Sequence, residues 1–130
     1  MKIKYIAPAY RRTRIYIAGP YTAPDPCINT NVALKMADTL WELGYAPFVP
    51  HLCHFWHTMS PHPYEMWTEY VAEFLSSCDA VLRIPGDSTG SDKEVAYAKN
   101  LGIPVFYSLS TLQQEFPIQL IPVPHRSFQS

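Results

Sequence analysis

The sequence predicts a doubly wound α/β fold, a flavodoxin- or Rossmann-like parallel sheet of four to five strands flanked by helices. Residues 78–108 are predicted to form a strand, a loop, a helix and a strand, and residues 14–49 repeat that order. A strand–helix–strand crossover of this length joins parallel strands with a right-handed connection. Two such units in a chain of 130 residues indicate a single domain over 1–130.

The second unit begins with an apolar run from Ala80 to Ile84, which is typical of a strand buried on both faces. Pro85 and Gly86 end that strand, since neither residue favours an extended ladder. A small, polar loop, a helix that stops at Gly102 and a further strand follow. Their predicted ranges are 87–91, 92–101 and 103–107.

The first unit starts with a strand over 14–18 and ends with a strand over 46–49. Between them, a helix capped by Asn29 or Thr30 is expected to run to about Leu43, where Gly44 closes it. The buried stripe of this helix is predicted to hold Val32, Met36, Leu40 and Leu43. A strand order of 2-1-3-4 places a ligand crevice between residues 18–21 and 87–94.

The remaining segments are predicted as two helices and two termini. A helix over 64–77 buries Trp67, Val71, Phe74 and Leu75, and a short helix over 108–116 has Ser110 as its cap. Residues 1–13 form an arm or a leading strand. The apolar, proline-rich tail over 117–130 packs on the domain or on a second subunit, which favours a homo-oligomer, a dimer or higher.

The composition narrows the classes of partner. A formal net charge of −1 gives no reason to expect a nucleic-acid polymer or an anionic membrane. No apolar run is long enough to span a bilayer, and the first residues lack the apolar core of a signal peptide. Cys27, Cys53 and Cys78 are odd in number and widely spaced, which indicates free thiols in a reducing cytoplasm.

Glu94 is the residue of the second unit that points most directly to chemistry. It lies in the first turn of the predicted helix, where the helix dipole favours a carboxylate that stays ionised. Such a carboxylate beside a crevice is able to attack an electrophilic sugar carbon. Ser91 to Glu94 also fits the capping box S-x-x-E, in which Glu94 only bonds back to the Ser91 amide. The spacing leaves both interpretations open.

Residues 50–63 are rich in histidine and aromatic residues. Three histidines and Cys53 lie close together, but their spacing matches no standard zinc pattern, so no metal is expected. The segment is interpreted as a loop over the crevice whose rings stack on a planar ligand, or as an aromatic cluster that fills the edge of the core. Both interpretations remain open.

Two stretches resemble a known family. RIYIAGPY followed by a helix, and CDAVLRIPGDSTGSDKEVAYAKNLGIPVF, look like the nucleoside 2-deoxyribosyltransferase superfamily, which includes the nucleoside 5'-monophosphate N-glycosidases. PHLCHFWH with PYEMW resembles a set of small members of that group. The resemblance covers about residues 14–108.

The resemblance implies a covalent mechanism without a metal or an organic cofactor. Glu94 matches the family's nucleophile, which attacks the anomeric carbon and displaces the base. Water or a second base then releases the sugar with retention. Tyr16 matches a tyrosine that holds the nucleophilic carboxylate, although a tyrosine in a core strand is also common. Gly19 and Gly90 let backbone amides approach the substrate.

Two positions depart from the family pattern. The family usually carries an aspartate where this chain has Val71, and Glu69 and Glu73 point to nearly the opposite helix face. The proton chemistry on the leaving base is therefore not carried over. Ser88 stands where typical transferases have a sugar-binding aspartate, and the monophosphate hydrolases have serine there, which suits phosphate.

The expected function is cleavage of the N-glycosidic bond of a (deoxy)nucleoside or its 5'-monophosphate through a glycosyl-glutamate intermediate, with hydrolysis favoured. The alternatives are base exchange between deoxynucleosides and a nucleotide-binding module without turnover. Glu94 and Tyr16 are the expected catalytic residues. The expected substrate-binding residues are Gly19, Tyr21, Ser88, Gly90, Trp56, Trp67 and His54.

Overall fold

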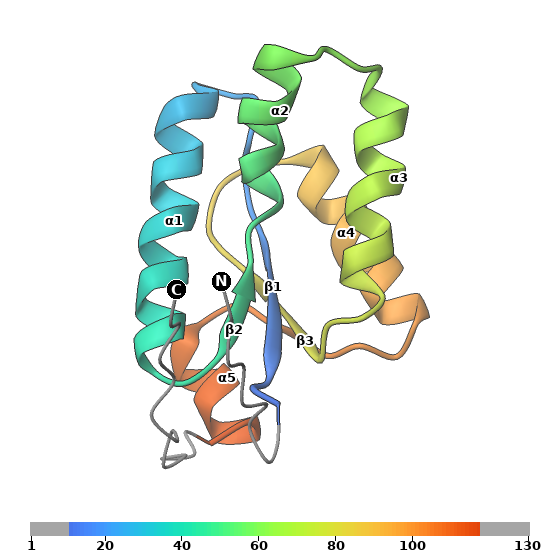
Figure 1. Cartoon of the computed structure of the whole chain (residues 1–130). Helices are drawn as coiled ribbons and strands as arrows, with labels where there is room; N and C mark the ends of the chain where they lie inside the picture. The colour runs from blue at the N-terminus through green and yellow to red at the C-terminus, as the bar shows by residue number, and fades with distance from the viewer. Residues whose placement is uncertain (1–10, 118–130) are drawn as a thin grey trace, which may run out of the picture.

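A computed structural model describes residues 11–117, and its centre is one parallel sheet (Figure 1). The strand order is β2-β1-β3-β4. The strands are β1 (Arg14–Ala18), β2 (Ala46–Phe48), β3 (Ala80–Arg83) and β4 (Val105–Phe106). The predicted fold class and the 2-1-3-4 order are confirmed. The described residues form four strands, where four to five were predicted.

Helices cover both faces of the sheet, with α1 and α5 on one side and α3 and α4 on the other (Figure 1). The short α2 lies above the carboxyl end of β2. The helices are α1 (Pro26–Glu42), α2 (Cys53–Met59), α3 (Tyr64–Leu75), α4 (Thr89–Asn100) and α5 (Leu109–Glu115), and a 3-10 turn, η1 (Pro50–Leu52), precedes α2.

Alternation along β1 divides the core into two clusters. Ile15 and Ile17 face α1 and α5, whereas Tyr16 and Ala18 face α3 and α4. All four side chains are fully buried, as a central parallel strand requires. Each large apolar side chain removed from water contributes roughly 1.5–3 kcal/mol before the entropy cost of ordering. β1 is therefore the strand around which both layers of helices are packed.

The start of α1 differs from the prediction. Asp25 is the N-cap, and its side chain accepts the Ile28 N–H at 3.0 Å, with Pro26 as the first helical residue. The helix thus begins before Asn29, because Asp followed by Pro is a stronger start signal than Asn29 or Thr30. The predicted stripe was also partly wrong, since Val32 is 51% exposed.

Three other predicted boundaries were wrong. Ser108, not Ser110, caps α5 by accepting the Thr111 N–H. The strand predicted over 103–107 pairs only at Val105 and Phe106. Residues 50–59 form η1 and α2 where a loop was expected. The predicted stops are confirmed, since Gly44 and Gly102 have positive φ and directly follow the C-caps of α1 and α4.

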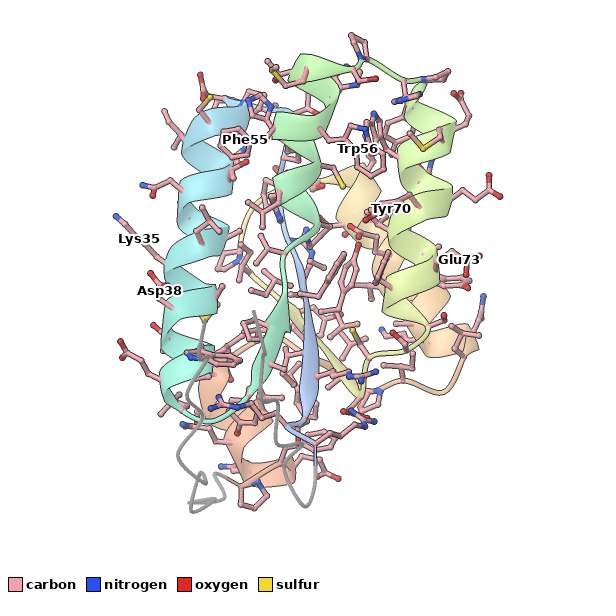
Figure 2. All side chains as sticks on the ribbon, viewed as in Figure 1. Lys35, Asp38, Phe55, Trp56, Tyr70 and Glu73 are labelled. Carbon is pink, nitrogen blue, oxygen red and sulfur yellow. The ribbon has the colours of Figure 1, made fainter. Side chains whose placement is uncertain are left out.

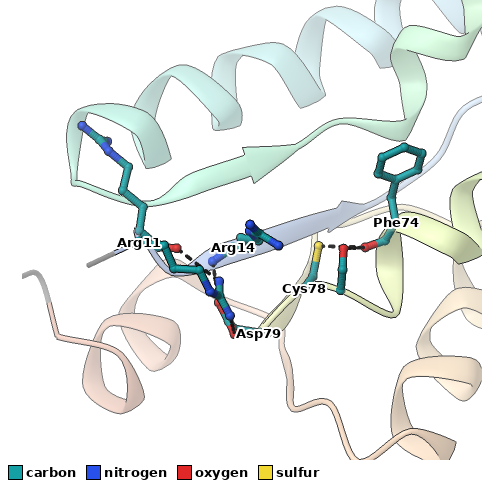
Figure 3. Close-up of polar contacts among 7 residues, drawn as sticks. Arg11, Arg14, Phe74, Cys78 and Asp79 are labelled. Atoms are coloured by element: carbon teal, nitrogen blue, oxygen red, sulfur yellow. Dashed lines mark hydrogen bonds and ion pairs between the residues drawn. The ribbon is translucent and has the colours of Figure 1, made fainter. Parts of the chain in front are cut away.

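Asp79 joins the starts of the two central strands (Figure 3). Its Oδ2 accepts the backbone N–H of Arg14 at 2.7 Å, and its two oxygens accept the Arg11 guanidinium at 2.8 Å each. The Asp79 N–H in turn donates to the Arg14 carbonyl. These bonds fix the register of β1 against β3, and therefore the relative positions of the loops that follow the two strands.

The predictions for the two termini fall almost entirely outside the described residues, since these are 11–117. The arm or strand at 1–13 and the tail at 117–130 thus remain predictions, as does the oligomer inferred from that tail. Within the described part of the chain, no helix has the length and apolar character needed to cross a bilayer.

Candidate active site

A cavity of about 780 Å³ opens at the carboxyl ends of β1 and β3. Its wall is formed by the loop after β1, by η1 and α2, by one face of α3, and by the first turns of α4. Ligands of open parallel sheets bind at this edge, where the strand order reverses. The predicted crevice between residues 18–21 and 87–94 therefore exists as a cavity.

The carboxyl of Glu94 and the hydroxyl of Tyr16 meet at the wall of this cavity. Tyr16 is fully buried on β1, and its hydroxyl donates to Oε2 of Glu94 from α4. A buried hydroxyl that donates to one carboxyl oxygen holds the carboxyl group in one orientation. The structure thus brings together the two residues to which the resemblance assigns catalysis.

Glu94 is not a capping residue. The N-cap of α4 is Ser88, whose Oγ accepts the Ser91 N–H at 3.1 Å, so the helix starts earlier than predicted and Glu94 lies in its second turn. The capping-box interpretation with Ser91 was wrong because Thr89-Gly90-Ser91 is helical rather than part of the loop. The side chain of Glu94 is therefore free of that backbone role.

The expectation that Glu94 is simply ionised also needs correction. Burial raises the pKa of Glu94 to about 7, and the opposing influences of the Tyr16 hydrogen bond and of the Arg83 charge only partly offset it. Burial, followed by the neighbouring Glu94 charge, raises the pKa of Tyr16 as well. The Glu94 carboxyl therefore keeps its proton to a higher pH than an ordinary glutamate does.

Ser88 and Gly90 lie in the wall where α4 begins. A Cβ on Gly90 would stand 3.4 Å from the Tyr64 hydroxyl, which is ordinary contact. Gly19 also lines the cavity, but a Cβ there would overlap the side chain of Ile84. The lack of a side chain at Gly19 therefore allows the residue after β1 to pack closely against Ile84, which follows β3.

The α3 wall is largely apolar. Val71, Ala72 and Leu75 line it, whereas Glu69 and Glu73 are exposed. Figure 2 shows Glu73 pointing away from the body of the protein. The described part of α3 therefore provides no carboxyl group to the cavity.

The predicted aromatic and histidine contacts divide into two groups. Tyr21 and Trp67 line the cavity, whereas Trp56 and His54 do not. Trp56 lies between α2 and α3, 5.1 Å from Tyr70 between ring centroids (Figure 2). His54 instead contacts Tyr21, since its Nδ1 lies 2.8 Å from the Tyr21 hydroxyl. Segment 50–63 therefore provides both cavity wall and an aromatic cluster at the edge of the core.

Three histidines of the cavity wall, His51, His57 and His62, were missing from the predicted site. His51 is buried, and its Nε2 lies 3.0 Å from the Pro20 carbonyl and 3.2 Å from the Gly19 carbonyl, so it anchors the loop after β1. Burial lowers its pKa despite these two bonds. His57 lines the cavity from α2. In the sequence, only the histidine-rich composition points to them, because this segment has no apolar period that indicates η1 and α2.

No metal centre is built into the part of the chain that the structure describes. Across residues 11–117, no three histidine, cysteine or acidic side chains converge as ligands. The three cysteines are free thiols, of which Cys53 lines the cavity. The absence of a metal requirement remains a prediction that protein chemistry has to test.

A family model described as a domain of unknown function, DUF7768, matches residues 13–108. The chain belongs to this family. The matched range includes the cavity and all of β1 to β4. No curated protein matches the sequence.

Among solved structures, the chain is similar to a 2-deoxyribosyltransferase from the psychrotolerant bacterium Bacillus psychrosaccharolyticus. The two share 24% sequence identity with a TM-score of 0.52, over 72% of this chain and 69% of that chain. At this identity the likeness shows a shared fold. It agrees with the α/β architecture that the sequence of this DUF7768 member predicted.

Proposed function

We propose that the protein cleaves the N-glycosidic bond of a (deoxy)nucleoside or nucleoside 5'-monophosphate, with Glu94 as nucleophile. The observation that carries this proposal is the hydrogen bond from Tyr16 to Glu94 at the wall of the cavity. A part-buried carboxyl held by a buried hydroxyl has the fixed position that attack on a sugar carbon requires. The likeness to a 2-deoxyribosyltransferase supports the same chemistry.

The proposed reaction has two steps. The Glu94 carboxylate attacks the anomeric carbon, and the electron pair of the N–C bond leaves with the base. Water then attacks the glycosyl ester, which returns the carboxylate and gives net retention. Tyr16 keeps Oε2 of Glu94 in place, so that the other oxygen is available for attack.

Ser88 and the start of α4 favour a 5'-phosphate in this proposal. The first amides of a helix are unpaired donors that attract an anion, and the Ser88 hydroxyl stands among them. Lys93 also lines the cavity and adds positive charge, whereas Asp87 opposes it. A phosphate held here anchors the sugar while Glu94 reacts.

Base transfer is the second candidate, because the solved structure to which the chain is similar is a 2-deoxyribosyltransferase. Transfer differs from hydrolysis only in what attacks the ester, a second base or water. Binding without turnover is the third, and the apolar α3 wall favours it, because Val71 has no proton to give to a leaving base.

One incubation separates these three candidates. Purified protein is mixed with ribo- and deoxynucleosides and their 5'-monophosphates, with and without a second free base, and the products are separated by chromatography. Free base alone indicates hydrolysis, an exchanged nucleoside indicates transfer, and a thermal shift without product indicates binding. Mass spectrometry of quenched reactions should find the sugar on the peptide that contains Glu94. A glycosylated peptide elsewhere in the chain, or turnover without any ester, would refute the proposed role of Glu94.

A further inference from the structure

His57 accepts two hydrogen bonds at one ring nitrogen. Its Nδ1 lies 2.9 Å from the indole Nε1 of Trp67 and 3.2 Å from the backbone N of His62. Both partners are N–H donors and neither is able to accept. The Nδ1 of His57 must therefore present a lone pair, and the proton of the neutral ring lies on Nε2.

That Nε2–H has no partner within residues 11–117, and the ring belongs to the cavity wall. Trp67, which also lines the cavity, meets the His57 ring edge-on with centroids 5.8 Å apart. The wall thus contains a hydrogen-bond donor whose orientation and tautomer are fixed by its neighbours.

We propose that His57 is a further catalytic residue, whose Nε2–H binds an acceptor atom of the leaving base, and that Trp67 is the positioning residue that fixes this proton on Nε2. The proposal rests on the proposed N-glycosidic cleavage. A ring nitrogen or a carbonyl oxygen of the base is the acceptor that this donor recognises.

The charge changes of the reaction explain why such a donor accelerates it. When the N–C bond breaks, its electron pair moves onto the base, and the hydrogen bond from Nε2–H strengthens as that negative charge develops. His57 keeps its proton, and the departed base takes one from water. The hydroxide so formed, or another water, hydrolyses the glycosyl ester, so the net reaction consumes one water. A donor of this kind compensates for the apolar α3 wall around Val71.

The first test is spectroscopic and needs no substrate. In 15N-labelled protein at pH 8, His57 should show an unprotonated Nδ1 and a protonated Nε2. Trp67→Phe removes the shorter of the two N–H contacts and keeps an aromatic ring, so it should increase the share of the Nδ1–H tautomer, while the His62 N–H still favours Nε2–H. Trp41→Phe, at an exposed position that stacks on Arg12, is the matched control and should change nothing. A proton found on Nδ1 in the parent protein overturns the proposal.

The second test is kinetic, on the substrate that the parent turns over best. His57→Phe should lower kcat by about 10- to 100-fold with a smaller change in KM, as expected for a donor that acts mainly in the transition state. His57→Gln retains an N–H near the position of Nε2 and should recover much of that loss. A kcat for His57→Phe within twofold of the parent overturns the catalytic role.

A third measurement separates failure of this inference from failure of the proposed function. Adenine is titrated into the labelled protein, and the His57 Nε2 resonance is followed. If the parent turns over no N-glycoside but adenine shifts this resonance, the base contact is supported while the proposed function fails. If turnover is present and neither His57→Phe nor adenine has an effect, the proposed function stands and the inference is overturned.

Discussion

The hydroxyl of Tyr16 on β1 hydrogen-bonds to Oε2 of Glu94 in the second turn of α4. This bond links the central strand to the helix that follows β3, across the edge of the sheet where the strand order reverses. The position of the carboxyl is therefore set by the most deeply buried strand. Four of the predictions below follow from this pair.

Glu94→Gln is expected to lower the turnover rate by at least about a thousandfold, because an amide is a poor nucleophile. The fold should persist, since a glutamine is still able to accept the Tyr16 hydrogen bond. Asp92→Asn is a control on the same helix, because Asp92 is exposed and its ion pair among residues 11–117 is with Arg83 at 3.5 Å. Near-normal turnover by Glu94→Gln, measured in the same assay, would contradict the nucleophile assignment.

The pH dependence of kcat/KM should report the ionisation of Glu94. Its pKa is raised to about 7 in the free protein, and only the carboxylate attacks. We expect kcat/KM to rise as the pH increases from 6 to 8, with a midpoint near 7. A profile that is flat over this range, measured with substrate well below KM, is incompatible with that assignment.

Tyr16→Phe should move this midpoint upwards. The Tyr16 hydrogen bond stabilises the Glu94 carboxylate and so lowers the pKa of Glu94, whereas burial raises it. Without the hydroxyl, the pKa of Glu94 should be higher still. The ratio of kcat/KM at pH 9 to kcat/KM at pH 7 should therefore be larger for the variant than for the parent. A midpoint unchanged from the parent would mean that the hydroxyl does not contact the ionised carboxyl in solution.

Glu94 should also make folding stability depend on pH. Its pKa is about 7 in the folded protein, against an ordinary value of 4.5 for a glutamate in water, so the folded state binds more protons between these values. The free energy of unfolding should therefore fall as the pH rises through this window, by up to about 3 kcal/mol. The lowered pKa of His51 acts in the opposite direction below pH 6.5.

Glu94→Gln isolates that contribution, because His51 is present in both proteins and its effect cancels in the difference. Urea unfolding at pH 5 and pH 8 should show the variant gaining stability relative to the parent at the higher pH. An equal difference at both pH values would mean that the Glu94 carboxyl is not perturbed by burial.

Ser88→Asp should reverse the preference between substrates. The parent is expected to have a higher kcat/KM for a nucleoside 5'-monophosphate than for the nucleoside. An aspartate at position 88 is still a good N-cap for α4, so folding should be preserved, while its charge repels phosphate and its oxygens bind sugar hydroxyls. Equal parent activity on both substrates would remove the basis for a phosphate preference.

Asp79→Ala should destabilise the fold by about 2 kcal/mol, whereas Arg11→Ala should cost less than about 1 kcal/mol. The reason is that Asp79 also accepts the Arg14 backbone N–H, while the Arg11 guanidinium is half exposed. Burial raises the pKa of Asp79, but the bonds from Arg11 and Arg14 outweigh it and lower the pKa. This stabilisation should be present above pH 4 and should be lost as the pH falls further. Equal costs for the two variants in urea unfolding would assign the effect to the ion pair.

The architecture could be predicted because its signals are local and periodic. The apolar runs at β1 and β3 and the glycines after α1 and α4 mark their elements whatever surrounds them. Helix starts were less predictable, since several residues of α1 and α4 are acceptable caps and packing selects among them. Asp25 and Ser88 are the caps of the helices that place Ala33 and Ala98 against the sheet.

The candidate site was predictable only in part. The resemblance and the strand order predicted Glu94, Tyr16 and Ser88, because they indicate which residues lie close together at the edge of a parallel sheet. The positions of His54 and His57 depend on the helical conformation of α2. A mixed run of aromatic and histidine residues has no apolar period that predicts this helix. Their partners, Tyr21 and Trp67, lie on other elements, so no local pattern joins them.

The outer strands of the described sheet have a consequence for aggregation. β2 has three residues and β4 has two, and the central residue of β2 is Pro47, which has no N–H to offer. Edges this short provide little template for a strand from another molecule, so amyloid-like edge pairing is disfavoured. Within residues 11–117, exposed apolar side chains on helices, such as Phe55 and Met59 of α2, are better suited to contacts between copies of the chain. Substitutions there should alter solubility without disturbing the sheet.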